Sequence, residues 1–483
     1  AGSFVRFGLG PPPARRGLGT LPAVTAAVPS PSVPPQELRT MAGHAASVWV
    51  GQVAVMAFGA VDTIVAGRHS DLSLAALAIG SSVFVTVYVS LNGLLTALLP
   101  IWAELHGGRR LAAIGPSARQ SLYLCAAASV LGMALLLHPQ PILRVTQVPP
   151  ELRTVAAEYL AVVGWSLPAS LLFRAFSTLS QALGKPQLVS WLQVAALAVK
   201  VPLSVGLTFG IWGLPELGVV GCAWATFAVN FFLCGLALWL LRTQPLFVAL
   251  GLWRRVEPPH GPTLRAFARL GVPAALTLVV EITSFTLMAL FVARLGTTAT
   301  AAHQIAANVT ALLYMTPLAL AIAASARVGY WRGAGDEARA RALALLAVRL
   351  ALGLALLMAT AVLLLRGWIV GIYTAHAGVA LLAAQLLAWV ALLHVSDAMQ
   401  TVSIFVLRCY RVTLAPFVVY CVLLWGVGLG GGYLLAYHGL GPWPAQLSPA
   451  AFWQAAAGSL LVTAGVVRWL LGWVSARAVE AEA

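Results

Sequence analysis

Residues 41–67 read MAGHAASVWVGQVAVMAFGAVDTIVAG, an apolar segment in which Asp62 is the one side chain charged at neutral pH. A helix of ~20 apolar residues is long enough to cross a hydrocarbon core about 30 Å thick. Similar segments recur to the end of the chain. The sequence predicts twelve membrane-spanning helices, at residues 41–67, 73–103, 119–138, 155–183, 188–212, 217–242, 271–294, 299–328, 341–371, 377–408, 415–439 and 451–475.

The composition agrees with an all-α membrane protein. Of the 483 residues 60% are hydrophobic and only 9% are charged, and the mean hydropathy is +0.90. That leaves too little polar surface to cover a water-soluble globule of this size. The five cysteines show no CxxC or CxxH spacing, so a packing role is favoured over a metal site or a disulfide.

The net charge of +15 is explained by membrane topology. If the N-terminus lies inside, most Lys and Arg side chains fall in the tails or in connections that also lie inside. The basic residues then expected outside are Arg68, Arg144, Arg153, Arg294 and Arg366. The positive-inside rule therefore predicts that both termini are cytoplasmic, and no nucleic-acid partner is expected.

A faint internal repeat predicts two lobes of six helices. Ala75-Ala76 with Ile79 has the spacing of Ala301-Ala302 with Ile305, 226 residues later. An even number of spans between the copies keeps their orientation the same. The expected organisation is a disordered Pro-rich cytoplasmic tail at 1–40, an N-lobe at 41–242, a cytoplasmic connection at 243–270, a C-lobe at 271–475 and a cytoplasmic tail at 476–483.

Three carboxylates, Asp62, Glu281 and Asp397, lie well within the predicted spans. A carboxylate at bilayer depth costs several kcal/mol unless it is paired, hydrated or protonated. One interpretation is a structural hydrogen bond between helices. The other is a role in binding a proton or a cation from an aqueous cavity, which makes these acids the candidate coupling residues.

The surroundings of two of these acids suit an alkali cation. Glu281 follows Thr277 by one turn and precedes Thr283 and Ser284, and Asp397 follows Ser396. Carboxylate, hydroxyl and carbonyl oxygens are the ligands of hard cations. A Na⁺ site at Glu281 and Asp397 is therefore possible, although a proton is an equal candidate for the same carboxylates.

Lys200 is the one lysine within the predicted spans, and we expect it to pair with Asp62. A charged lysine within ~4–6 Å would hold Asp62 ionised and weaken its use as a proton carrier. The alternative is a pair that breaks and reforms during transport. Arg174, in the fourth span, is a further candidate for lining a cavity.

Several motifs, in their order along the chain, resemble the NorM-like branch of the multidrug and toxic compound extrusion (MATE) family. They are GAVDTIVAG at 59–67, the stretch from GKP at 184–186 to PELGVVGC at 215–222, VEI at 280–282, AAHQIAAN at 301–308 and SDAMQ at 396–400. The resemblance covers about residues 41–475.

This resemblance implies two six-helix lobes that form a V-shaped cleft and alternate between outward and inward openings. It also implies export of lipophilic cations in exchange for Na⁺ or H⁺, with no cofactor besides the coupling ion, by a monomeric protein of the bacterial inner membrane. Glu281 and Asp397 match the family's cation-binding acids in the second lobe, and Asp62 matches its acid in the first lobe.

Two positions depart from the family pattern. Where members often carry Asn-x-Pro-x-Asn in the fifth helix, this chain reads Lys200-Val201-Pro202-Leu203-Ser204, which puts a standard proton site in the first lobe in doubt. Where some members carry a Tyr one turn before Asp397, Leu393 removes a candidate cation ligand.

Three polar residues of the eighth span are supporting candidates. Gln304 and Asn308 lie one turn apart and share a helix face, which favours an inward polar stripe. His303 is a candidate for lining the second-lobe site, although a lone histidine in a membrane helix is more often a packing group.

The sequence thus favours an ion-coupled multidrug exporter whose partners are small lipophilic cations and the lipid bilayer. A lipid-linked oligosaccharide flippase is the alternative, but three acids against one Lys and one Arg within the spans are a poor match for a pyrophosphate. No HExxH motif or phosphate-binding loop is present, so an enzyme is not expected.

Overall fold

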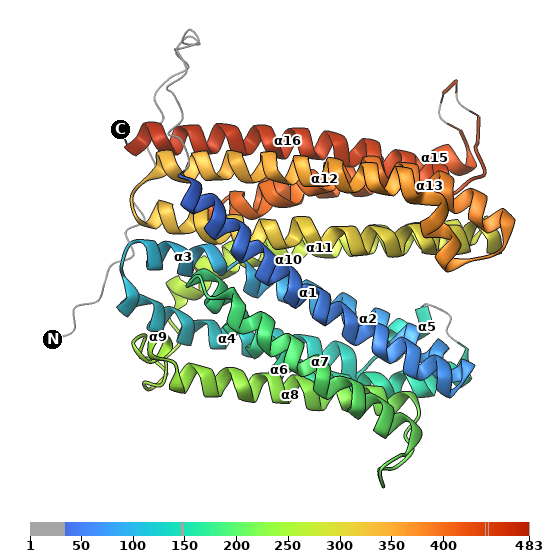
Figure 1. Ribbon diagram of the computed structural model, residues 1–483, viewed down its shortest axis with the longest axis horizontal. Coiled ribbons are helices and arrows are strands. Elements are labelled where there is room, and N and C mark those ends of the chain that lie inside the picture. The colour runs from blue at the N-terminus through green and yellow to red at the C-terminus, as the bar shows by residue number, and fades with distance from the viewer. Residues whose placement is uncertain (1–33, 146–148, 440, 443, 483) are drawn as a thin grey trace.

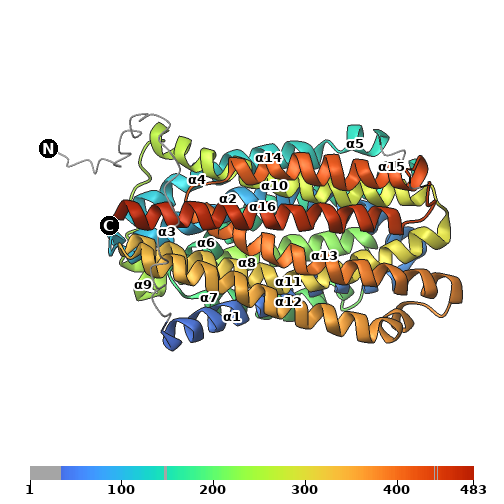
Figure 2. The same cartoon turned by 90° about the horizontal axis from the view of Figure 1, so that it is seen from above.

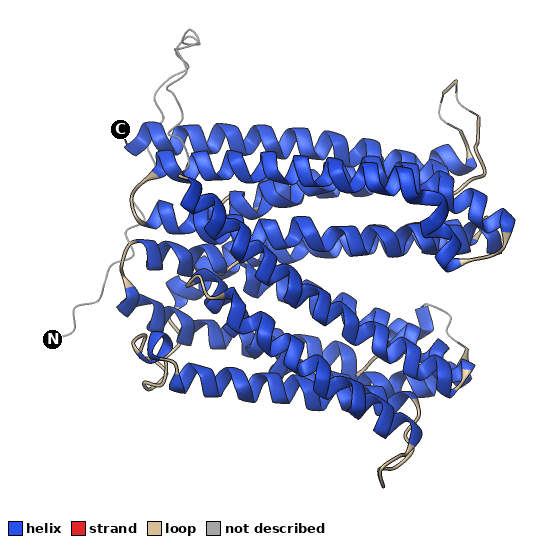
Figure 3. Ribbon diagram, viewed as in Figure 1, coloured by secondary structure: helices blue, strands red, loops and turns tan. Residues whose placement is uncertain are grey.

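The computed structural model describes residues 34–145, 149–439, 441–442 and 444–482. Within them the chain forms helices, turns and loops but no strand (Figure 3). Twelve helical segments are long and apolar enough to cross a membrane. The prediction of twelve spans in an all-α membrane protein is confirmed.

The elements follow the predicted order, and two spans contain more than one of them. The bounds are α1 (Pro35–His69), α2 (Asp71–Thr96), α3 (Leu99–Gly107), α4 (Leu111–Leu137), α5 (Gln140–Val145), α6 (Pro150–Ala182), α7 (Pro186–Phe209), α8 (Val219–Thr243), α9 (Pro245–Val248), α10 (Gly261–Ala293), α11 (Thr297–Gly333), α12 (Glu337–Tyr373), α13 (Ala377–Cys409), α14 (Leu414–Tyr420), the π-helical η1 (Cys421–Gly430), α15 (Gly431–Tyr437) and α16 (Ala450–Glu482). Helix α2 ends at Thr96 and α3 begins at Leu99, because Pro100 has no backbone N–H to donate to the preceding turn.

Helices α1–α9 pack into one lobe and α10–α16 into another (Figure 1). In the N-lobe α6 packs against α2, α4 and α8, and α7 against α1 and α8. In the C-lobe α13 packs against α11, α12 and α16. The view from above shows that the long helices run along one common direction, as expected for a membrane bundle (Figure 2).

The lobes meet at the end of the bundle where α1 begins and α16 ends, here named the terminal end. There α11 packs on α1 and α3, and α10 packs on α2. Towards the opposite end the two sets of helices diverge, so the lobes form a V (Figure 1). The interface at the terminal end therefore holds the V together.

Small residues allow this interface to close. A Cβ added at Gly107 of α3 would lie 1.8 Å from the backbone oxygen of Tyr330, and one added at Gly333 of α11 would lie 1.9 Å from that of Glu104. Glycine is required at both positions because the backbones of α3 and α11 approach too closely for any side chain.

Two ion pairs join the lobes at the same end. Arg327 of α11 contacts Glu37 of α1 at 2.6 Å, with both Nε and Nη2 donating to the carboxylate. Arg411, just after α13, contacts Glu104 of α3 at 2.6 Å. The bidentate Arg327 pair is the more directional of the two.

The structure corrects some predicted boundaries. Residues 35–40 are not part of a disordered tail, because α1 begins at Pro35 with proline in its first turn and Glu37 beside its N-terminus, both of which favour a helix start. Residues 1–33 lie outside the described residues. The predicted connection at 243–270 contains α9 and the first turns of α10, and α16 continues through the predicted tail to Glu482.

The connection between the lobes is fastened to α4 of the N-lobe. Arg119 donates to both carboxylate oxygens of Glu257 and to the backbone oxygen of Gly251. Tyr123 donates to the backbone oxygen of Glu257. Gln120 Nε2 donates to the backbone oxygen of Pro258, and Gln120 Oε1 accepts from the backbone N–H of His260. The last residues of the connection are therefore held against α4 up to the start of α10.

We expect Glu257→Gln to lower the thermal stability of the purified protein at neutral pH. The Arg119 hydrogen bond lowers the pKa of Glu257 below its ordinary value. A carboxyl whose pKa is lowered on folding stabilises the fold above its ordinary pKa, and this stabilisation is lost as the pH falls through the lowered value. Because Glu257 is partly exposed, the effect is small. A melting-temperature difference that stays constant from neutral pH to about pH 3 would contradict this role.

Candidate functional site

The two predicted acids of the C-lobe lie on different helices. Glu281 lies half-buried in the middle of α10, and Asp397 is 5% exposed on α13. Their carboxyl groups interact electrostatically. Helix α11 packs against both α10 and α13 and sets their separation. The structure therefore brings together two acids that are 116 residues apart in the sequence.

Asp397 is surrounded by neutral oxygen and nitrogen groups. Gln400 Nε2 donates to Asp397 Oδ1 at 3.0 Å, and the Thr401 hydroxyl also bonds the carboxyl. Among the described residues, Gln400 Oε1 and Ser396 Oγ are buried without a hydrogen-bond partner. These oxygens, with the two carboxyl groups, fit the needs of a bare alkali cation or of a proton with its water. In the described residues no cluster of three or more His, Cys, Asp and Glu could hold a metal.

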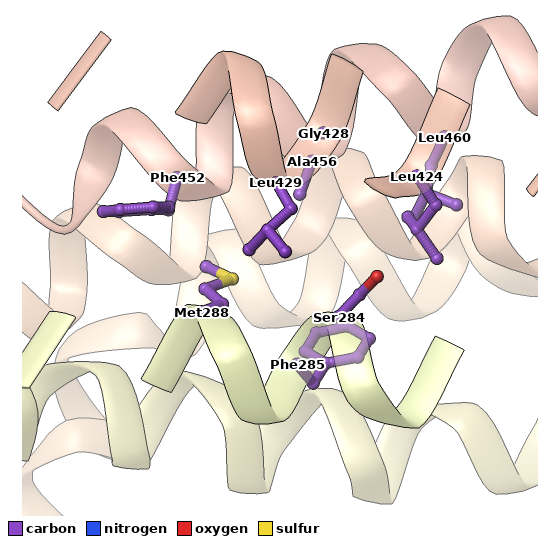
Figure 4. Close-up of a pocket in the computed structure, with 9 residues that line it drawn as sticks. All are labelled: Ser284, Phe285, Met288, Leu424, Gly428, Leu429, Phe452, Ala456 and Leu460. Atoms are coloured by element: carbon purple, nitrogen blue, oxygen red, sulfur yellow. The ribbon is translucent and has the colours of Figure 1, made fainter. Parts of the chain in front are cut away.

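The hydroxyls predicted beside Glu281 are used differently. Thr277 and Thr283 donate to the backbone of their own helix, at Pro273 and Val279. Ser284 points into a small cavity of about 20 Å³, whose other lining residues are apolar (Figure 4). The remaining lining residues are Phe285, Met288, Leu424, Gly428, Leu429, Phe452, Ala456 and Leu460. The two threonine hydroxyls are thus bonded within their own helix, whereas Ser284 Oγ has no hydrogen-bond partner among the described residues.

Sequence reasoning missed three side chains of the C-lobe site. Arg408 of α13 was placed with the cytoplasmic connections, but its side chain is buried, lies 4.0 Å from the Phe405 ring centroid and acts electrostatically on Glu281. Tyr314 of α11 and Tyr420 of α14 interact with the same acids. Arg408 follows Asp397 by eleven residues, or three helical turns, and therefore shares its face.

The eleventh span departs from α-helical geometry beside Glu281. Residues 421–430 form the π-helical η1, which packs against α10 and α16. From η1, Trp425 Nε1 donates to the backbone oxygen of Val280 at 3.1 Å. Such irregular turns occur frequently at functional sites. This one anchors the backbone immediately before Glu281.

In the N-lobe the expected pair is present. Lys200 Nζ of α7 lies 2.8 Å from Asp62 Oδ1 of α1. Ser204, one turn after Lys200, donates to the same carboxylate oxygen at 2.9 Å. Lys200 and Asp62 are both buried, with 1% and 6% of their surface exposed. Arg174 of α6 is also buried, and its Nη2 lies 3.5 Å from the Tyr88 hydroxyl.

The three candidates on α11 separate into two kinds. Gln304 Nε2 donates to Asn308 Oδ1 at 3.3 Å, and both side chains are exposed, so they share one face as predicted. His303 is buried and accepts a hydrogen bond from Trp453 Nε1 of α16 at 3.2 Å. That contact is the helix-packing arrangement expected of a lone membrane histidine.

Two lobes of helices long and apolar enough to span a membrane, each with a buried carboxylate within a span, are the features expected of a membrane transporter. The family model described as MatE matches residues 48–205 and 273–434, one segment in each lobe and together more than half of the chain. The chain therefore belongs to the MATE family, whose members are transporters and not enzymes. The resemblance seen in the sequence is confirmed.

Bacterial relatives support the same assignment. The chain is 36% identical over 451 residues to a protein of Aromatoleum aromaticum described as probable multidrug resistance protein NorM, covering 92% of this chain and 96% of the relative. It is 35% identical over 418 residues to the multidrug resistance protein MdtK of Klebsiella pneumoniae, covering 86% and 91%. With its twelve spans, it is a multi-pass protein of the bacterial inner membrane.

Solved structures share the fold. The eukaryotic MATE transporter AtDTX14 matches with a TM-score of 0.79 at 17% identity, over 93% of this chain and 99% of that one. A structure described as the outward-facing conformation of a multidrug resistance MATE family transporter matches with a TM-score of 0.80 at 16% identity, over 91% and 96%. The two-lobe V-shaped architecture is therefore confirmed.

Proposed function

We propose that this protein is a secondary active multidrug exporter that exchanges lipophilic cations for Na⁺ or H⁺. The observation that carries the proposal is the pairing of Glu281 and Asp397 inside the C-lobe, next to oxygens that lack hydrogen-bond partners in the described structure. Relatives named as multidrug resistance proteins support the substrate class. The protein acts as a monomer and needs no cofactor besides the coupling ion.

Exchange follows if the coupling ion and the substrate compete for these carboxylates. An acidic site attracts a cationic substrate by charge, while apolar walls accept varied shapes. Binding of the ion to Glu281 and Asp397 neutralises them and releases the substrate. Coupling requires only that each ligand bind differently to the two orientations of the lobes.

The closed interface supports an outward-open orientation of the lobes. With both termini cytoplasmic, as the distribution of Lys and Arg predicts, the terminal end is the inner end. The lobes are joined there by the Glu37–Arg327 and Glu104–Arg411 pairs and diverge at the outer end. The structure then represents the outward-open state, and alternating access requires that these contacts separate.

The test is ethidium or fluoroquinolone efflux from cells that express the protein, measured with and without Na⁺ across a pH series. We expect efflux above the empty vector that depends on one of the two ions. Dependence on Na⁺ at constant pH would name Na⁺, and dependence on the pH gradient alone would name H⁺. Efflux equal to the empty vector for every substrate would contradict the proposal and favour the lipid-linked oligosaccharide flippase.

A further inference from the structure

We propose that Lys200 is a fixed counter-ion that withdraws Asp62 from ion coupling, so that the coupling ion binds only in the C-lobe. This inference rests on the proposed exchange function. It concerns the buried ion pair between Lys200 of α7 and Asp62 of α1. Its consequence is a transporter with one acidic site instead of two.

The ammonium group of Lys200 has an acceptor for each of its three hydrogens. Nζ lies 2.8 Å from Asp62 Oδ1, 2.6 Å from Thr226 Oγ1 and 3.2 Å from the backbone oxygen of Cys222. An ammonium group has three donors and no acceptor, so these contacts satisfy it completely. The acceptors come from α1 and α8, which fixes the lysine of α7 between two other helices.

Asp62 is held mainly through Oδ1, because the one Thr226 hydroxyl proton has a shorter bond, 2.9 Å, to the backbone oxygen of Cys222. Oδ1 accepts from Lys200 and from the Ser204 hydroxyl, and Oδ2 lies 3.4 Å from the Thr226 hydroxyl. A carboxylate whose charge is already matched by a contacting ammonium group attracts a further cation only weakly.

Burial makes the pair difficult to separate. With 1% and 6% of their surface exposed, Lys200 and Asp62 gain little from water when they part. Removing one partner of a buried pair leaves an uncompensated charge, which is strongly unfavourable. Two other titratable groups interact with Asp62, Tyr159 of α6 and Cys222 of α8, and both are neutral in their ordinary forms.

The C-lobe acids are in a different state. Within the described residues no basic side chain forms an ion pair with Glu281 or Asp397, whereas Asp62 has one. Arg408 acts on Glu281 electrostatically without such a contact. The carboxyl groups of Glu281 and Asp397 thus remain available to an incoming ion or substrate. The N-lobe acid is instead part of an ion pair with no net charge.

A double-mutant cycle tests the proposal in the efflux assay. Asp62→Asn and Lys200→Met each leave one buried charge without its partner, so each single variant is expected to lose about tenfold or more of the efflux rate. The double variant, Asp62→Asn with Lys200→Met, removes both charges together. We expect it to recover at least half of the wild-type rate, with the same dependence on Na⁺ and pH.

A folding measurement accompanies the cycle. The melting temperature of the purified single variants should fall and that of the double variant should return towards wild type, while Ser204→Ala should change little. A double variant that folds like wild type but does not export, or whose export loses its ion dependence, would show that Asp62 carries the coupling ion. If the wild type itself shows no ion-driven efflux, the proposed function fails instead, and this inference with it.

Discussion

Replacing Glu281 by glutamine, or Asp397 by asparagine, should reduce ion-driven efflux by roughly 5- to 150-fold, the range that corresponds to a coupling free energy of about 1–3 kcal/mol. Both substitutions keep the shape of the side chain and remove its negative charge. The neutral amide no longer attracts a cationic substrate and cannot exchange a proton. Efflux rates at saturating Na⁺ and at several pH values provide the measurement.

A carboxylate far from the site is the matched control. Glu480→Gln changes the same chemical group on the exposed end of α16 and should leave efflux unchanged. Both C-lobe variants should also reach the membrane in wild-type amounts, since the acids lack ion-pair partners whose loss would disturb folding. Normal ion-coupled efflux in Glu281→Gln and in Asp397→Asn would refute the assignment of the site.

Leucine in place of Gly107 or Gly333 should block the cycle by keeping the inner interface open. The added side chain would overlap the backbone of the facing helix, since even a Cβ would lie within 2 Å of a backbone oxygen. Overpacking of this kind costs about 1–3 kcal/mol or more, enough to shift the balance between orientations by roughly 5- to 150-fold.

The measurement combines the efflux rate with the melting temperature of the purified variants. Gly353→Leu serves as the control, because Gly353 is exposed on α12 and a Cβ there meets nothing within 4 Å. We expect the control to transport normally and the two interface variants to fold but export slowly. Wild-type export by both interface variants would mean that the contact between α3 and α11 is not part of the transport cycle.

The fold was largely predictable because lipid imposes simple rules on sequence. All twelve spans were found from their apolar length, and the pairing of Lys200 with Asp62 followed from the cost of leaving either charge alone in the membrane. The positions of Glu281 and Asp397 followed from the same cost. In each case a strong local signal is enough to identify the residue.

The parts that were missed depend on contacts between distant segments. Arg327 and Glu37 are 290 residues apart, and nothing in either local sequence indicates that they meet. Arg408 was assigned to the cytoplasmic connections because it ends an apolar span, although its place on the Asp397 face was available from helical periodicity. Tyr314 and Tyr420 are ordinary apolar-span residues until the lobe is assembled around them.

The most direct test of the central claim uses the purified protein in proteoliposomes with ethidium as substrate. An imposed gradient of Na⁺ or H⁺ should drive ethidium in the opposite direction, and an ethidium gradient should drive the same ion back. Both fluxes should be lost in Glu281→Gln and retained in Glu480→Gln. Ethidium movement that proceeds at one rate with and without ion gradients, and that is unchanged in Glu281→Gln, would contradict ion-coupled exchange at the C-lobe carboxylates.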